Sequence, residues 1–185
     1  LYSQQSAEDD IQNQTMKNYD SQIERFERNV SNIGKQFHIL TTYNYKCYDL
    51  IVFEPKKRTE LKSIVLVAVS NTQLVLFDGD NDSILSSNNP RVEFAKESVS
   101  KWFIEQIHTT HNSDNQGNTL MSYFLKYAEE NDVSVITGEL RPDSPKEGKD
   151  HWNRLQKYYE KYGFTVTWNN TEHSKGKIKL LLSSK

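Results

Sequence analysis

The sequence predicts an α/β domain with a mixed, twisted β-sheet flanked by helices and preceded by an amphipathic helix. Runs of β-branched and aromatic residues separated by turn residues fill much of 37–77, which is typical of neighbouring strands. From residue 101 onward, segments with strand and helix patterns alternate, which indicates a sheet with crossover helices. We therefore assign residues 1–35 to the N-terminal helix and residues 36–185 to the α/β domain.

Composition excludes several classes of protein. With 185 residues, 35% of them hydrophobic, the chain is long enough for one packed domain. Its longest apolar run, Ile64–Val69, is far shorter than the roughly 20 residues of a membrane-spanning helix. The single cysteine, Cys47, cannot form an internal disulfide, which favours a reducing cytoplasm.

Charge is distributed unevenly along the chain. The net charge is −2, but residues 143–185 contain nine Lys or Arg and five Asp or Glu, which leaves +4 there and −6 elsewhere. Such a segment attracts anions such as a phosphorylated ligand, or it is simply a solvated lysine face. Because no dense patch of arginine and aromatic residues accompanies it, we do not expect nucleic acid as a partner.

The N-terminal helix is predicted from apolar residues that recur at steps of three and four. They are Met16, Tyr19, Ile23, Phe26, Val30 and Ile33. This heptad seam must be buried against another surface, either the chain's own domain or a second copy in a homodimer. Asn32 and Gly34 are expected to end the helix.

Four strands are predicted before residue 78, at Phe37–Tyr43, Tyr48–Phe53, Ser63–Val69 and Gln73–Phe77. Asn71 lies between the last two, and the short turn there favours antiparallel pairing. The Asp and Asn residues that follow predict an exposed loop over Asp78–Pro90.

The second half is predicted to contain strands at Lys101–Thr109, Val133–Leu140, Phe164–Trp168 and Lys177–Leu182, and helices at Gly117–Asn131 and Asp150–Tyr162. Each helix has an apolar stripe that should face a sheet. Gly163 provides a left-handed stop directly after the second helix. The first two of these strands, joined through one helix, should pair in parallel by a right-handed crossover.

The most informative segment is the polar turn Asn112–Gly117, which joins a strand to a helix. The first turn of a helix exposes unpaired N–H groups and a partial positive charge, so this turn can cradle a phosphate. Gly117 would allow a ligand to approach the main chain, and Asn115 can adopt a positive φ. A purely structural turn is the alternative.

The segment Arg154–Phe164, with the sequence RLQKYYEKYGF, closely resembles a segment of the GNAT superfamily of acyl-CoA-dependent N-acetyltransferases. The order of strands and helices over about residues 100–182 also fits that family. The resemblance implies a sheet whose central and following strands separate to admit acetyl-CoA as acyl donor.

The resemblance also implies the residues that bind the donor. The family's phosphate turn aligns with Asn112, Asn115 and Gly117, of which only Gly117 matches the family's residue type. The N–H groups expected to bind the diphosphate belong to Asn115, Gln116, Gly117, Asn118 and Thr119. The main chain of Ile107, His108 and Thr109 corresponds to the segment that pairs with pantetheine like an added strand.

Catalytic residues follow from the same resemblance. Tyr159 aligns with the tyrosine that protonates the departing thiolate, and a phenol with a pKa near 10 remains protonated at neutral pH. A core aromatic residue is the alternative interpretation of Tyr159. Glu105 and Glu139, with His108 third, are candidate bases for the amine, and deprotonation through water remains open. His108 and His111 lack further ligands at familiar spacing, so we expect no metal site.

The sequence thus predicts a cytoplasmic transferase that moves an acetyl group from acetyl-CoA to a primary amine by direct attack in a ternary complex. Orienting the two substrates would provide most of the acceleration. The alternative is a protein that retains the fold without turnover and acts as a binding or regulatory module through the heptad seam.

Overall fold

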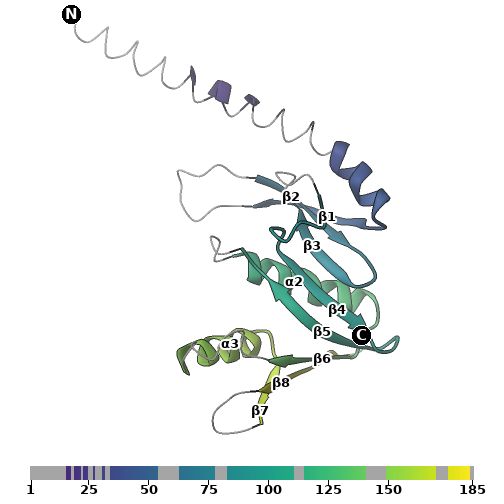
Figure 1. Ribbon diagram of the computed structural model, residues 1–185, viewed down its shortest axis with the longest axis vertical. Helices are drawn as coiled ribbons and strands as arrows, with labels where there is room; N and C mark the ends of the chain where they lie inside the picture. Colours follow the sequence, from purple (N-terminus) through teal and green to yellow (C-terminus); the bar gives the residue numbers. More distant parts are fainter. Residues whose placement is uncertain are drawn as a thin grey trace, which may run out of the picture.

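An eight-stranded mixed sheet forms the centre of the molecule (Figure 1). The computed structural model describes residues 16–17, 19–21, 23–24, 27, 31, 34–53, 63–77, 83–110, 115–140, 149–169 and 175–183. The strands are β1 (Lys46–Phe53), β2 (Ser63–Val69), β3 (Gln73–Phe77), β4 (Arg91–Lys96), β5 (Lys101–His108), β6 (Val135–Leu140), β7 (Thr165–Trp168) and β8 (Gly176–Leu181). Their order across the sheet is β1-β2-β3-β4-β5-β6-β8-β7.

Strand direction divides the sheet into two parts. Neighbours from β1 to β5 are antiparallel, β5 and β6 are parallel, and β8 runs antiparallel to both β6 and β7. Helix α2 (Gln116–Glu130) connects β5 to β6, and α3 (Lys149–Lys161) lies between β6 and β7 in the chain. This mixed sheet with flanking helices confirms the predicted α/β fold class, including the parallel pairing of two strands joined through one helix.

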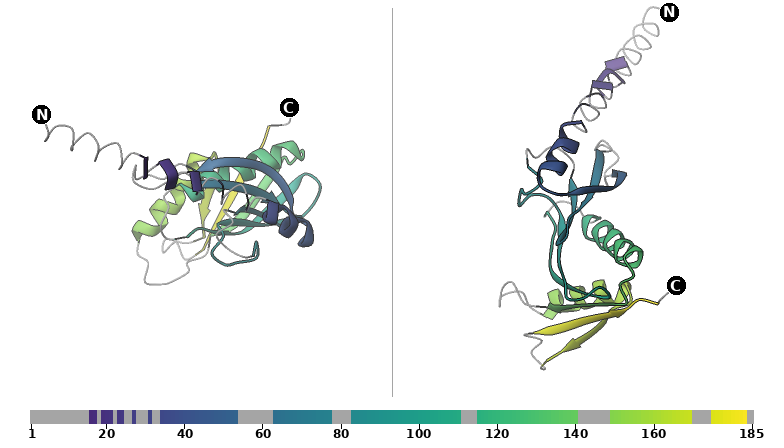
Figure 2. Two further views of the ribbon diagram at one scale, coloured as in Figure 1. Left: turned by 90° about the horizontal axis from the view of Figure 1, so that it is seen from above. Right: turned by 90° about the vertical axis from the view of Figure 1, so that its right-hand side faces the viewer.

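The two helices bury the faces that their sequence patterns predict. Leu120, Met121, Phe124 and Ala128 of α2 are fully buried against the sheet, and Figure 2 shows α2 lying across one of its faces. Trp152 and Tyr159 of α3 are buried as well, and Trp152 meets Trp168 of β7 edge to face. Gly163 follows α3 with a φ of +82°, as a left-handed stop requires.

The predicted strand Phe37–Tyr43 is wrong, because residues 34–42 are helical. Leu40 is buried against β2 and β3, whereas Phe37 and Tyr43 are exposed, so burial follows the helical period rather than strict alternation. The predicted stop at Gly34 is also wrong, because Gly34 lies in this helical segment, while Asn32 lies outside the described residues. The segment ends at residue 42, and Asn44 with a φ of +58° makes the left-handed turn into β1.

The loop predicted as exposed over Asp78–Pro90 is only partly so. Residues 78–82 lie outside the described part of the chain, but Ile84, Asn89 and Pro90 are buried. The Asn89 amide donates to the carbonyls of Ser83 and Ile84 at 2.9 and 3.1 Å, which satisfies it in the interior. The sequence prediction also missed β4, whose apolar Val92 and Phe94 alternate with charged or half-buried neighbours.

The heptad seam does not dock on the domain where the structure describes it. Met16, Tyr19 and Ile23 are 65%, 62% and 54% exposed, while Phe26, Val30 and Ile33 lie outside the described residues. Within the described residues, no helix is long and apolar enough to cross a membrane.

Candidate active site

A fork between β5 and β6 marks the candidate site (Figure 1). The parallel pairing begins at Lys101 with Val135 and ends at Ile104 with Gly138. Beyond this point β5 continues to pair with β4 as far as His108, and β6 continues to pair with β8 as far as Leu140. Beyond Ile104, therefore, β5 forms no ladder with β6 or with any other described strand on that side.

Gly138 lies at the apex of this fork. A Cβ atom at this position would lie 3.0 Å from the main-chain oxygen of Ile104 and 3.0 Å from side-chain carbons of Ile178. A side chain at residue 138 would therefore push the two strands apart at their last paired residues. The register of β5 against β4 also shifts here, because Phe94 pairs with Ile104 while Glu93 pairs with Gln106. This leaves Glu105 as the extra residue of a bulge.

The two candidate carboxylates lie on opposite sides of the fork. Glu105 directly follows Ile104 on β5, and Glu139 directly follows Gly138 on β6. Both side chains are exposed, whereas Ile104 and Leu140 beside them are buried. The structure thus brings together two residues that are 34 positions apart in the sequence, at the point where the strands separate.

The start of α2 lies immediately beyond the end of β5. No acidic side chain lies in the first turn of α2, and the Asn115 side chain makes no capping hydrogen bond. The N–H of Thr119 donates to the carbonyl of Asn115 at 2.9 Å, but for the N–H groups of residues 116–118 no acceptor lies among the described residues. An uncapped first turn without an acidic residue is suited to an external anion. Asn112 lies outside the described residues.

Side chains fix this helix start to β5 and leave space at Gly117. The Gln116 side-chain oxygen accepts hydrogen bonds from the main-chain N–H and the hydroxyl of Thr110, both at 2.9 Å. A Cβ atom at Gly117 would make only ordinary contacts, 3.5 Å from the Tyr158 hydroxyl and 3.6 Å from Thr109. The chain's own packing therefore does not require glycine here, and its absence of a side chain leaves the main chain accessible to a ligand.

Tyr159 is buried between α3 and the sheet, with 7% of its surface exposed. Its ring lies edge to face with Phe164 at 5.5 Å, and burial raises the pKa of its phenol to about 12. The hydroxyl has no hydrogen-bond partner among the described residues, an arrangement that costs free energy in a protein interior. The stripe pattern predicts this burial, so Tyr159 belongs to the core, and its hydroxyl is a donor that no described residue accepts from.

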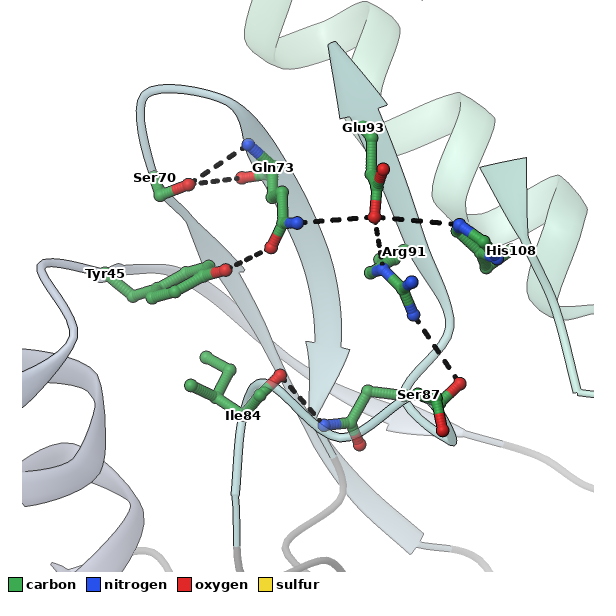
Figure 3. Close-up of polar contacts among 9 residues, drawn as sticks. Tyr45, Ser70, Gln73, Ile84, Ser87, Arg91, Glu93 and His108 are labelled. Atoms are coloured by element: carbon green, nitrogen blue, oxygen red, sulfur yellow. Dashed lines mark hydrogen bonds and ion pairs between the residues drawn. The ribbon is translucent and has the colours of Figure 1, made fainter. Parts of the chain in front are cut away.

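The predicted pantetheine-pairing residues differ in their surroundings. Ile107 packs on the core, Thr109 is exposed, and the Nε2 atom of His108 lies 3.6 Å from the Glu93 carboxylate. Figure 3 shows that Glu93 also accepts hydrogen bonds from Arg91 at 2.7 Å and Gln73 at 3.4 Å. Sequence reasoning missed Glu93 and its partners because it did not recognise β4, although the alternation of apolar and charged residues there was a usable signal.

No protein-family model matches this sequence, and no curated protein matches it. Among solved structures, many similar chains are GNAT-family acetyltransferases. Ard1 from Thermoplasma volcanium is 17% identical, with 64% of this chain and 70% of that chain covered and a TM-score of 0.40. The N-acetyltransferase PseH from Campylobacter jejuni is 17% identical, with 62% and 71% covered and a TM-score of 0.44. Because these values are low, we derive a function from this chain's own contacts.

Proposed function

We propose that this protein is an acyl-CoA-dependent N-acyltransferase that transfers an acetyl group from acetyl-CoA to a primary amine by direct attack in a ternary complex. The fork between β5 and β6 is the observation that carries this proposal. Among the described residues, the β6 side of β5 has no ladder beyond Ile104, and Gln116 at the start of α2 is bonded to Thr110 near the end of β5, so two kinds of main-chain binding group lie near each other. An extended amide-containing chain that ends in a diphosphate matches both.

The chain's own residues fit such a donor. The β5 edge of Ile107, His108 and Thr109 would pair with the pantetheine amides, and the N–H groups of residues 115–118 would receive the diphosphate. The N–H of Thr119, expected from the sequence to join them, instead donates to the carbonyl of Asn115. Gly117 has no side chain of its own to stand between the donor and the main chain. The bound thioester would supply the activated acyl group. Lys146, Lys149 and Lys175 from the basic C-terminal segment are further candidates for phosphate contacts.

Two side chains would carry the proton transfers, one as base and one as acid. Glu105 or Glu139 would accept the proton of the attacking amine, because only the neutral amine attacks a carbonyl carbon. Tyr159 would donate its phenolic proton to the departing sulfur. Its high pKa keeps it protonated at neutral pH. Its buried hydroxyl has no acceptor among the described residues, and a bound substrate would provide one.

Thermal unfolding with acetyl-CoA tests the donor site. A ligand at about 100 times its dissociation constant adds roughly 2.7 kcal/mol to the free energy of unfolding, a Tm rise of about 5–11 °C for a domain of this size. Free CoA should also stabilise, and an unrelated nucleotide should not. No shift at millimolar acetyl-CoA would contradict the proposal.

Transfer itself is tested with a panel of primary amines, with release of free thiol as the measurement. The variants Glu105→Gln and Glu139→Gln test which of the two carboxylates acts as the base. The variant that lacks the base should lose at least tenfold in kcat/KM at pH 7 and recover at higher pH, because more of the amine is then neutral. Its partner variant is the matched control. Equal turnover in both variants would favour deprotonation through water.

A second candidate function is a binding module that pairs through the heptad seam. The exposure of Met16, Tyr19 and Ile23 favours it, because apolar side chains at heptad spacing are rarely left in water. We propose a second copy as the partner. Sedimentation should then show a dimer that Ile23→Lys dissociates. A dimer together with an absence of acetyl-CoA binding would support this function over the transferase.

The exposed thiol of Cys47 is consistent with a reducing cytoplasm as the compartment.

A further inference from the structure

Helix α3 contacts the first turn of α2 through three polar side chains. The Tyr158 hydroxyl donates to the carbonyl of Gly117 at 2.6 Å. The Tyr162 hydroxyl lies 3.3 Å from the carbonyl of Asn118 and 2.9 Å from its side-chain oxygen, which also accepts from Lys161 at 3.2 Å. Residues more than 40 positions apart in the sequence are thus joined at the helix start where the diphosphate is proposed to bind.

The positions of these acceptors determine what the contacts do. The acceptors are the carbonyl oxygens of Gly117 and Asn118, which are directed along α2, and the side-chain amide oxygen of Asn118. None of the three contacts therefore uses an N–H group of the first turn. The carbonyl of Gly117 belongs to the peptide group whose N–H is that of Asn118. The carbonyl of Asn118 likewise belongs to the peptide group that contains the N–H of Thr119.

A hydrogen bond to a carbonyl oxygen polarises the whole peptide group and strengthens its N–H as a donor. The N–H of Thr119 already donates to the carbonyl of Asn115, and the Tyr162 hydroxyl lies nearest the side-chain oxygen of Asn118, so Tyr162 acts mainly by holding Asn118 in place. Tyr158 acts on the N–H of Asn118, which is expected to face the anion, from the opposite end of the same peptide bond. It also fixes the orientation of that peptide group, because the tyrosine ring is itself held. The Tyr158 ring lies edge to face with both Tyr159 and Tyr162, at 5.3 and 5.4 Å.

We propose that Tyr158 and Tyr162 are positioning residues for the donor's diphosphate: Tyr158 orients and polarises the peptide group between Gly117 and Asn118, and Tyr162 holds Asn118 in place. This inference rests on the proposed function and adds to it two residues that do not touch the reacting atoms. Lys161, whose amine contacts Asn118, adds positive charge beside the same turn. A cation at the positive end of a helix is unfavourable unless an anion binds beside both. The position of Lys161 is therefore consistent with a bound phosphate.

The experiment compares two donors in the full-length protein. One is acetyl-CoA, and the other is S-acetylpantetheine, which carries the same thioester and amides but no diphosphate. Steady-state kinetics are measured for the wild type, Tyr158→Phe and Tyr162→Phe. Tyr127→Phe is the matched control, because Tyr127 lies in α2 and packs its ring on Phe94 and Trp102.

We expect Tyr158→Phe and Tyr162→Phe to raise the KM for acetyl-CoA about three- to tenfold, the effect of losing one modest hydrogen bond, with kcat little changed. The KM for S-acetylpantetheine should stay at the wild-type value, because this donor has no diphosphate. Tyr127→Phe should change neither KM. The advantage of acetyl-CoA over the shorter donor should therefore shrink only in the two α3 variants.

Two results would overturn the inference. An unchanged KM for acetyl-CoA in both α3 variants would show that the tyrosines do not serve the diphosphate. An equal loss with both donors would assign the tyrosines a general structural role. Failure of the proposed function looks different, because the wild type itself would then neither bind nor turn over acetyl-CoA.

Discussion

Tyr158 and Tyr159 are adjacent in α3, but their hydroxyl groups have different surroundings. The Tyr158 hydroxyl is bound to the carbonyl of Gly117, whereas that of Tyr159 is buried without a partner among the described residues. Burial raises the pKa of both phenols. One side chain therefore fixes main-chain geometry, and the other keeps a proton available.

Replacement of Tyr159 by phenylalanine separates catalysis from folding. Tyr159→Phe keeps the ring contact with Phe164 but removes the donor, so kcat should fall at least tenfold. Because no described residue accepts from the hydroxyl, its removal should leave the Tm unchanged or raise it by a few degrees. Turnover assays and thermal unfolding of the same preparations measure both effects, with Tyr127→Phe as control. Unchanged turnover would remove Tyr159 from the mechanism.

At this scale the sequence predicts residues that follow a local pattern and misses those defined by long-range contacts. The apolar stripe of α3 predicts the burial of Tyr159, because helical spacing is visible within one turn. The contact between Tyr158 and Gly117 spans 41 residues, and no local pattern contains it. Glu105 and Glu139 could be named as candidates from residue type, but only the register of β5 and β6 places them at one fork.

The next scale is that of the strands and helices. The sequence predicts α2, α3, β2 and β3 closely, because each has a strong period and clear turn residues at its ends. It fails over residues 34–42, where aromatic and β-branched residues suggest a strand while the heptad spacing continues in a helix. Tertiary packing overrides the strand propensity there, because Leu40 packs against β2 and β3 from a helix.

Two glycines provide opposite predictions for their elements. Gly138→Ala would place a Cβ 3.0 Å from the Ile104 oxygen, so we expect the free energy of unfolding to fall by about 2 kcal/mol and the Tm by roughly 4–8 °C.

Gly34 has nothing within 4 Å of its Cβ position and lies in a helix. Gly34→Ala should therefore stabilise by up to about 1 kcal/mol. Calorimetry measures both, and a neutral Gly138→Ala would show that the apex of the fork is not tightly packed.

Across the whole molecule, tyrosines make stability sensitive to alkaline pH. Six of them have raised pKa values, mainly from burial: Tyr45, Tyr48, Tyr123, Tyr127, Tyr158 and Tyr159. Between pH 10 and pH 12 the unfolded chain releases phenolic protons that the folded protein retains. The folded state then binds more protons, so the free energy of unfolding falls as the pH rises.

Urea denaturation from pH 9 to pH 11.5 checks this prediction. Tyr159 alone, with its pKa raised from 10.0 to about 12, would account for a loss of roughly 2–3 kcal/mol across the full titration. Tyr159→Phe should therefore show a shallower decline than the wild type. A free energy of unfolding that does not change over this range would contradict the prediction.

The position of β8 has a consequence for how the chain reaches its fold. Strands β1 to β5 each pair with the strand that comes next in the sequence, so this part can assemble as it leaves the ribosome. The other part cannot, because β8 comes after β7 in the sequence but lies between β6 and β7. Until Gly176–Leu181 has been synthesised, one edge of β6 and the whole of β7 have no strand to pair with. A chain interrupted before Gly176 would lose two strands of the sheet and expose an aggregation-prone edge.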